Sequence, residues 1–228
     1  MYVLHIGNKN YSSWSLRPWL LMRVLGIPFE ERLTPFPVGP SFDLYRQFSP
    51  NGRVPCLVDD GWAVWDSLSI VEYLAERHPG VWPVDAKARA WARSAAAEMH
   101  SSFTALRNDC PMCCGVRVEP LPMSPALKHD LFRMGDLWND GLLRFGGPFL
   151  AGDRFGAVDA FFAPVAFRAQ SYGLPFEGEA ADYPRRLLDL PAMREWYAAG
   201  LAETWREPGH EAEVSAAGTI VEDLRATA

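Results

Sequence analysis

Two short segments, Val54-Pro55-Cys56-Leu57 and Asp66-Ser67, contain the residue types needed to bind the main chain and the head group of a small peptide. The bond before Pro55 is a candidate cis peptide, because cis bonds are almost confined to proline. A fixed bend there leaves the N–H and C=O of Val54 free to pair with an extended ligand. Asp66-Ser67 stands where an apolar strand gives way to a helix, so its carboxylate, its hydroxyl and free helix N–H groups suit both charges of an amino-acid head group.

A second group of polar side chains, Ser12, Ser13 and Ser15, lies at the expected start of a helix over Ser15–Gly26. Serine is a preferred N-cap residue, so these hydroxyls could serve only to cap the helix. They could also do chemistry, because a hydroxyl donor and a helix N-terminus both lower the pKa of a thiol, which is ordinarily about 8.5. The second interpretation predicts an activated sulfur nucleophile at this point.

With these residues, the chain resembles the glutathione transferase superfamily. The stretch Ser12-Ser-Trp-Ser-Leu-Arg17 is similar to the Ser-Ser-Cys-x-x-Arg opening of the zeta class, and Asn51–Leu57 with Asp66-Ser67 is similar to the family's glutathione site. The resemblance covers nearly the whole chain, and the order and spacing of the motifs make it specific although each motif is short. It implies a thioredoxin-like N-terminal domain followed by a helical-bundle C-terminal domain, an α/β plus all-α fold.

The resemblance also implies a role for individual residues. In the family, the serine at the position of Ser12 hydrogen-bonds the glutathione sulfur, and the residue at Val54, held by Pro55, pairs its main chain with the cysteinyl unit. Asp66 and Ser67 then hold the γ-glutamyl end. Arg53 stands where the family often places a cation near the glycyl carboxylate.

The chain departs from the zeta pattern at Trp14, where zeta enzymes have a cysteine, and three residues are candidates for the thiol-activating group. Ser12 fits the zeta spacing counted from Arg17, whereas Ser13 fits the insect delta pattern. Tyr11 is in the same loop, and other transferase classes use a tyrosine hydroxyl. We rank Ser12 first, with Ser13 and Tyr11 as alternatives.

Composition agrees with this interpretation. With 228 residues and 49% hydrophobic content, the chain is long enough for two modest cores, which favours two domains. No apolar run approaches the length of a membrane span, and the N-terminus lacks the pattern of a signal peptide, so we expect a cytoplasmic protein. A net charge of -6 without a block of lysine or arginine argues against nucleic-acid binding.

Cys110, Cys113 and Cys114 include the two-residue spacing found in zinc sites and redox pairs. No second pair or nearby histidine completes a metal set, and the segment follows a helical stretch instead of opening a thioredoxin-type domain. We therefore expect free thiols beside a pocket, and no metal.

The elements that must position these residues follow from periodicity and turn signals. Residues 1–78 predict the thioredoxin-like domain, residues 79–87 a linker with prolines, and residues 88–228 an all-helical domain. The expected elements of the first domain are Tyr2–Ile6, Ser15–Gly26, Phe29–Leu33, Ser41–Phe48, Cys56–Val58, Trp62–Trp65 and Leu68–Arg77. The expected helices of the second domain are Ala88–Arg107, Pro125–Phe145 and Ala157–Tyr172, with no strand signal after Lys87.

Side chains of the second domain supply an electrophile pocket and a structural carboxylate. Met99, Phe103 and Arg107 fall on neighbouring faces of the expected helix 88–107 and are candidates for the pocket wall, with core packing as the alternative for the apolar two. Arg107 could meet an anionic co-substrate or only the helix dipole. Asp159 reads as a helix cap near Gly156, not as a catalytic carboxylate.

Three functions remain open from the sequence. The first and favoured one is a homodimeric glutathione transferase, with glutathione as co-substrate, that joins the thiol to a small hydrophobic electrophile in detoxification. The second is a zeta-like isomerase of the maleylacetoacetate type; Gln170-Ser171 stands where those enzymes have an arginine for a diacid, so this function ranks lower. The third is a binding protein that keeps the fold without turnover.

Overall fold

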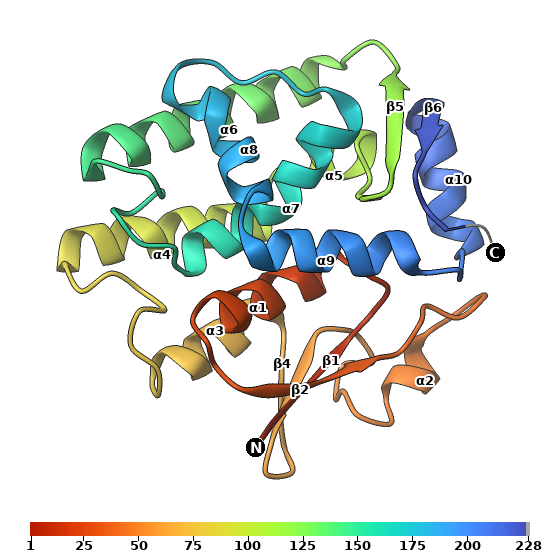
Figure 1. The fold of residues 1–228 in the computed structure, drawn as a ribbon, viewed down its shortest axis with the longest axis horizontal. Coiled ribbons are helices and arrows are strands. Elements are labelled where there is room, and N and C mark those ends of the chain that lie inside the picture. The colour runs from red at the N-terminus through yellow and green to blue at the C-terminus, as the bar shows by residue number, and fades with distance from the viewer. Residues whose placement is uncertain (227–228) are drawn as a thin grey trace.

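The computed structural model describes residues 1–226, so positions 227 and 228, the last two of the predicted helical domain, lie outside the described residues. The chain forms two parts, a small sheet with its helices near the N-terminus and a larger helical part (Figure 1). The α/β plus all-α fold predicted from the sequence is confirmed.

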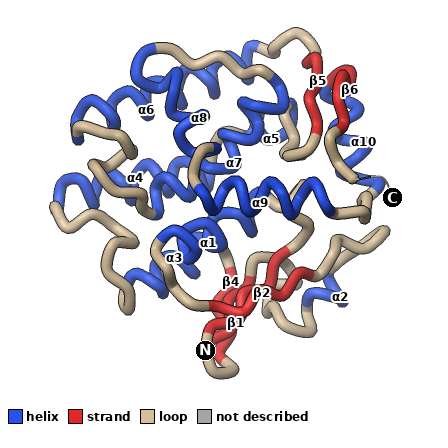
Figure 2. The backbone as a smooth tube through the Cα atoms, in the orientation of Figure 1, coloured by secondary structure: helices blue, strands red, loops and turns tan. Residues whose placement is uncertain are grey.

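The sheet has four strands, which Figure 2 shows in red below the helices. They are β1 (Tyr2–Ile6), β2 (Phe29–Leu33), β3 (Cys56–Asp59) and β4 (Trp62–Trp65), in the order β2-β1-β3-β4. β2 runs parallel to β1, whereas β3 and β4 are antiparallel to their neighbours. The β3–β4 hairpin turns through Asp60 and Gly61, both with positive φ, which is the backbone that an Asp-Gly turn favours.

Three helices belong to this part: α1 (Ser13–Val24), α2 (Phe42–Tyr45) and α3 (Ser67–Ala75). α1 and α3 lie between the sheet and the helical part (Figure 1). α1 is buried along most of its length because it packs against the sheet and also against α7 of the helical part. Ser12 and Ser13 at the start of α1, and Asp66-Ser67 at the start of α3, therefore lie at helix N-termini close to the boundary between the two parts.

The helical part begins after residues 76–85, which contain no helix or strand. Its helices are α4 (Ala86–Ser101), α5 (Thr104–Asp109), α6 (Pro125–Phe145), α7 (Ala157–Tyr172), the 3₁₀ turn η1 (Gly178–Asp182), α8 (Tyr183–Leu188), α9 (Pro191–Ala202) and α10 (Pro208–Ala217). α7 is at the centre and packs against α1, α4 and α8. Among residues 1–226, no helix is long and apolar enough to cross a bilayer.

The expected continuous helix over 88–107 is wrong. α4 ends at Ser101, and α5 starts only after Phe103, whose φ of 59° is incompatible with a right-handed helix. The carboxylate of Asp130, on α6, accepts a hydrogen bond from the N–H of Leu106 at 3.0 Å and so satisfies a free donor in the first turn of α5. This break depends on a contact with a distant helix, which periodicity alone does not reveal.

The expectation of no strand after Lys87 is also wrong. β5 (Val116–Pro120) pairs antiparallel with β6 (Gly218–Asp223), and the two form a separate sheet beside α10 (Figure 1). Each strand is short, and their partners are about a hundred residues apart in sequence, so neither forms a local hairpin signal.

Asp159 has the structural role expected of it. Its Oδ1 accepts hydrogen bonds from the N–H of Leu150 at 3.0 Å and from the hydroxyl of Tyr183 at 2.7 Å, and its Oδ2 accepts from the N–H of Gly156 at 2.9 Å. The carboxylate therefore joins the start of α7 to the preceding loop and to α8. Burial raises the pKa of Asp159 to about 6, although these hydrogen bonds act to lower it.

Candidate active site

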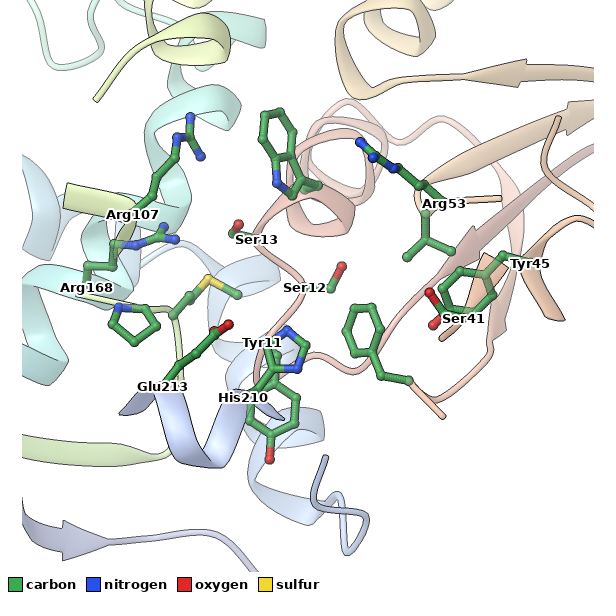
Figure 3. Close-up of a pocket in the computed structure, with 15 residues that line it drawn as sticks. Tyr11, Ser12, Ser13, Ser41, Tyr45, Arg53, Arg107, Arg168, His210 and Glu213 are labelled. Atoms are coloured by element: carbon green, nitrogen blue, oxygen red, sulfur yellow. The ribbon is translucent and has the colours of Figure 1, made fainter. Parts of the chain in front are cut away.

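Two adjoining cavities lie beside α1: the larger is between the sheet part and the helical part, and the smaller is lined by residues of the sheet part. The larger, of about 330 Å³, is lined by Tyr11, Ser12, Ser13, Trp14, Phe36, Ser41, Tyr45, Arg53, Val54, Arg107, Pro111, Met112, Arg168, His210 and Glu213 (Figure 3). The smaller, of about 170 Å³, is lined by Trp14, Asn51, Arg53, Val54, Pro55, Asp66 and Ser67. Because they share Trp14, Arg53 and Val54, a ligand in the smaller cavity can extend into the larger one.

The Val54–Pro55 peptide is cis, as the sequence predicts. Val54 precedes β3, and within residues 1–226 no group is hydrogen-bonded to its main chain. Its N–H and C=O are thus available to an extended peptide. Arg53 is exposed beside it, and its N–H is held by the side chain of Asn51 at 3.1 Å.

Asp66 is the N-cap of α3 and has an unusual backbone, with φ 74° and ψ 134°. L-residues rarely adopt such positive φ values, and residues held there are concentrated at binding and active sites. Oδ1 of Asp66 accepts a hydrogen bond from the N–H of Leu68 at 2.8 Å, and Oδ2 lies 3.5 Å from Nε2 of His100. Burial lowers the pKa of His100, although Asp66 acts in the opposite direction.

Arg17 lies directly behind Ser67 and is fully buried. Its Nη1 is 3.4 Å from the hydroxyl oxygen of Ser67, whereas Nε and Nη2 have no hydrogen-bond partner within residues 1–226. The guanidinium stacks between the rings of Trp14, at 4.1 Å, and Phe161, at 4.8 Å. Burial lowers the pKa of Arg17 because an unpaired cation is costly in an apolar environment. An anion at Ser67 would offset this cost.

Ser12 and Ser13 are at the start of α1 and line the larger cavity. The Ser12 hydroxyl makes no capping bond to the helix; it donates to Oγ of Ser15 at 2.7 Å, and Oγ of Ser15 also accepts from the N–H of Gly7 at 3.2 Å. In Figure 3 the Ser12 hydroxyl points into the middle of the cavity, and Ser13 lies on the side nearer Arg107 and Arg168. The Ser12 hydroxyl therefore lines the cavity without capping α1.

The loop before Ser12 is held by the helical part. The carboxylate of Glu203 accepts hydrogen bonds from the N–H groups of Lys9 at 2.6 Å and Asn10 at 3.2 Å. Nε1 of Trp196 donates to the C=O of Lys9 at 2.9 Å, and the N–H of Cys114 donates to the C=O of Asn10 at 3.2 Å. The position of Ser12 thus depends on both parts of the chain.

Comparison with known families identifies the fold. Residues 11–77 match the N-terminal domain of glutathione S-transferase, and residues 125–199 match its C-terminal domain, so the two matches cover more than half of the chain. The chain belongs to the glutathione transferase superfamily.

Individual relatives of the transferase superfamily are distant. The chain is 26% identical over 184 residues to a stringent starvation protein A homolog of Haemophilus ducreyi, which covers 77% of this chain and 79% of the relative. It is 27% identical over 168 residues to the glutathione S-transferase GstA of Escherichia coli O157:H7, covering 69% and 78%. A Burkholderia glutathione transferase homolog solved with bound glutathione has the same fold, with a TM-score of 0.64, 24% identity and coverage of 87% and 97%.

Tyr11 lines the larger cavity of this transferase fold with its ring, but its hydroxyl is occupied elsewhere. The hydroxyl donates to Oε1 of Glu211 on α10 at 2.6 Å and accepts from Nη1 of Arg225 at 3.3 Å. Burial, followed by the bond to Glu211, raises the pKa of Tyr11. Figure 3 shows the hydroxyl pointing away from Ser12.

Of the residues predicted for the electrophile pocket, the structure places only Arg107 in the wall of the larger cavity. Met99 and Phe103 are buried and do not line it: Met99 lies on α4 and Phe103 at the helix break, whereas Arg107 lies on α5. The C=O of Met99 accepts a hydrogen bond from Nη2 of Arg107.

Several wall residues were not predicted from the sequence. Arg168 comes from α7, and His210 and Glu213 come from α10. An arginine within the otherwise apolar residues 160–169 of α7 is a signal that could have identified Arg168, which is only 4% exposed. The two residues of α10 carry no such signal, because they reach the cavity only through the tertiary fold.

The three neighbouring cysteines Cys110, Cys113 and Cys114 are buried free thiols. Burial raises the pKa of Cys110 to about 11 and that of Cys113 to about 12, so neither is a thiolate at neutral pH. Among residues 1–226, no group of three His, Cys, Asp or Glu side chains is arranged to hold a metal ion.

Proposed function

We propose that this protein binds glutathione across the two cavities and transfers its thiol to a small electrophile. The observation that carries this proposal is that Ser12, at the N-terminus of α1, lines a cavity adjoining the one lined by Val54, Asp66 and Ser67. The Ser12 hydroxyl is thus close to the smaller cavity, which we call the groove and in which we propose that the peptide binds.

The groove offers a complementary group for each part of glutathione. The γ-glutamyl carboxylate would meet the Ser67 hydroxyl and the N-terminus of α3, with the charge of Arg17 behind them. The γ-glutamyl ammonium would pair with Asp66. The cysteinyl unit would pair with the main chain of Val54, and the glycyl carboxylate would lie near Arg53.

Ser12 would stabilise the thiolate by donating a hydrogen bond to sulfur, as the last member of a chain that runs from Gly7 through Ser15 to Ser12. A hydroxyl both donates and accepts, so the bond between Ser12 and Ser15 can reverse. Ser15 then accepts from the N–H of Gly7 and donates to Ser12, and Ser12 donates to sulfur. The N–H groups of Trp14 and Ser15, in the first turn of α1, have no partner within residues 1–226 and add positive potential at the same point.

The thiolate would attack the electrophilic carbon of a substrate held in the larger cavity. A carbon–sulfur bond forms, the leaving group departs with the bonding electron pair, and the thiol proton has already passed to solvent. The protein contributes by lowering the thiol pKa and by holding the two reactants close together.

Steady-state kinetics with glutathione and 1-chloro-2,4-dinitrobenzene tests the proposal. We expect saturable turnover above the uncatalysed reaction, with a loss of about one to two orders of magnitude in kcat/KM for Ser12→Ala. Serine to alanine at exposed Ser94 is the matched control and should leave kcat/KM unchanged. Saturable glutathione binding without turnover of this or any other electrophile would refute transfer and leave a binding protein.

A further inference from the structure

The wall that the helical part contributes to the larger cavity carries two arginines without an acidic partner. Arg107 comes from α5 and Arg168 from α7, and neither forms an ion pair within residues 1–226. By contrast, Arg133 pairs with Glu98 and Arg225 pairs with Glu211. Unpaired arginines in a cavity wall are an unusual arrangement, because charged side chains are seldom buried without a partner.

Main-chain carbonyl groups fix both guanidinium groups in place. Nε of Arg107 donates to the C=O of Ser102 at 3.2 Å, and Nη2 donates to the C=O of Met99. Nε of Arg168 donates to the C=O of Cys110 at 2.8 Å, and Nη1 to that of Pro164 at 3.4 Å. Each guanidinium has five N–H donors, so Nη1 of Arg107 and Nη2 of Arg168 keep donors with no partner among the described residues.

The charge around these donors is strongly positive. Arg53, Arg107 and Arg168 line the cavity, and Glu213, which is exposed, is its one lining carboxylate among the described residues. Burial, and then the charge of Arg107, lowers the pKa of Arg168 to about 10. Burial lowers the pKa of Arg107, whereas the charge of Asp130, which lies outside the cavity, acts to raise it. Oδ2 of Asp130 accepts its hydrogen bond from the N–H of Leu106 and not from Arg107.

Trp14 connects this cationic wall with the groove. Its ring has the guanidinium of Arg17 at 4.1 Å and that of Arg107 at 4.8 Å. The cavity lining also includes the apolar side chains of Phe36, Pro111 and Met112. The cavity thus combines apolar side chains with two fixed guanidinium groups, each with one nitrogen that has no partner among the described residues, beside Ser13 (Figure 3).

We propose that the electrophile of this protein carries a carboxylate, which binds Arg107 and Arg168 while an apolar body fills the rest of the cavity. This inference rests on the proposed function, because it names the substrate class of the same site. Guanidinium groups match the planar geometry of a carboxylate and bind it through paired hydrogen bonds. An anion there also offsets the cost of two unpaired cations, of which Arg168 is buried and Arg107 is half-buried.

Binding of unreactive probes tests this inference without turnover. Calorimetric titration of glutathione-saturated protein compares 3,5-dinitrobenzoate with 3,5-dinitrobenzamide, which differ in charge but little in shape. We expect the acid to bind at least about tenfold more tightly at neutral pH, and this preference to vanish in Arg107→Gln. Arg168→Lys keeps the charge but loses the fork, so it should weaken the acid and leave the amide unchanged.

Arg89→Gln is the matched control. Arg89 also donates to main-chain carbonyl groups, those of Pro83 and Val84, but it lies outside both cavities. Its substitution should leave both probes unaffected. Equal affinity of the acid and the amide for the unaltered protein would overturn the inference, as would a preference for the acid that survives in both Arg107→Gln and Arg168→Lys.

These titrations, together with the steady-state kinetics, separate this inference from the proposed function. If no electrophile is turned over but the acid still binds through Arg107, transfer fails and the anion site stands. If neutral electrophiles are turned over but the acid shows no advantage, transfer stands and the anion site fails. If Arg107→Gln weakens glutathione itself about tenfold and not the acid, the arginines hold the glycyl carboxylate and the inference is overturned.

Discussion

The hydroxyl of Tyr11 donates a hydrogen bond to Oε1 of Glu211 at 2.6 Å, and this bond connects the loop before α1 to α10. Arg225 bonds the same carboxylate through Nη1 and Nη2, at 2.5 and 3.0 Å. α10 in turn places His210 and Glu213 in the cavity wall. Tyr11 thus shapes the site by holding a helix over it, while Ser12 presents its hydroxyl to the cavity.

Asp66 and Ser67 should determine the affinity for glutathione. We expect Asp66→Ala and Ser67→Ala each to weaken glutathione binding about tenfold or more, because each removes a hydrogen bond to a charged group. Isothermal titration calorimetry measures the change. Asp60→Ala is the control, because Asp60 also has a positive φ, of 46°, but is exposed in the β3–β4 turn. Unchanged affinity in both site variants would remove the ligand from this groove.

Arg17 should increase the affinity for glutathione without adding to the free energy of unfolding. Arg17→Met replaces a buried, unpaired cation by an apolar side chain, so the free energy of unfolding should stay the same or rise. Glutathione affinity should fall about tenfold, because the positive charge behind Ser67 is lost. Chemical denaturation and calorimetry on the same variant measure the two effects. A large loss of stability with unchanged affinity would show that Arg17 supports only the fold.

Asp159 should make stability depend on pH. Asp159→Asn leaves one of three donors without an acceptor oxygen and should lower the free energy of unfolding by about 1–3 kcal/mol. The pKa of Asp159 is raised from 3.8 to about 6 in the folded protein. Its contribution to the free energy of unfolding is therefore complete below its unfolded pKa and is lost as the pH rises through about 6.

The loss caused by Asp159→Asn should therefore be larger at about pH 5 than at about pH 8. Urea denaturation at the two pH values, with exposed Asp153→Asn as control, measures the difference. A loss that is the same at both values, or larger at the higher one, would contradict the raised pKa.

A homodimer is expected from the superfamily resemblance, and two exposed tryptophans on the edge strand β4 offer apolar surface for association. Trp62 is 71% exposed and Trp65 is 44% exposed. Light scattering should give twice the chain mass of 25.5 kDa. A single-chain mass at working concentration would show that the protein is a monomer.

The parts of the site that the sequence predicts are those fixed by local structure. Ser12 and Asp66-Ser67 stand at helix starts, where periodicity and strand-to-helix transitions can be recognised along the chain. Val54 and Pro55 form a local motif. All of these residues line the two cavities.

The other half of the site depends on contacts between distant segments. Arg107 was predicted, but on a helix that in fact breaks at Phe103, where Asp130 of α6 bonds the first turn of α5. Arg168 was missed because α7 reads as an apolar core helix. His210 and Glu213 reach the cavity because Tyr11 and Arg225 hold α10 in place, and no period in the sequence encodes that contact.

The pKa of the thiol of bound glutathione tests the central claim most directly, and thiolate absorbance measured against pH gives it. We expect Ser12→Ala to raise this pKa by about one to two units, since a hydrogen bond to a charged group contributes about 1.5–3 kcal/mol. Ser13→Ala should raise it less, and Tyr11→Phe least, because the Tyr11 hydroxyl is bonded to Glu211. A titration that shifts in Tyr11→Phe and not in Ser12→Ala would contradict the assignment of Ser12 as the thiolate donor.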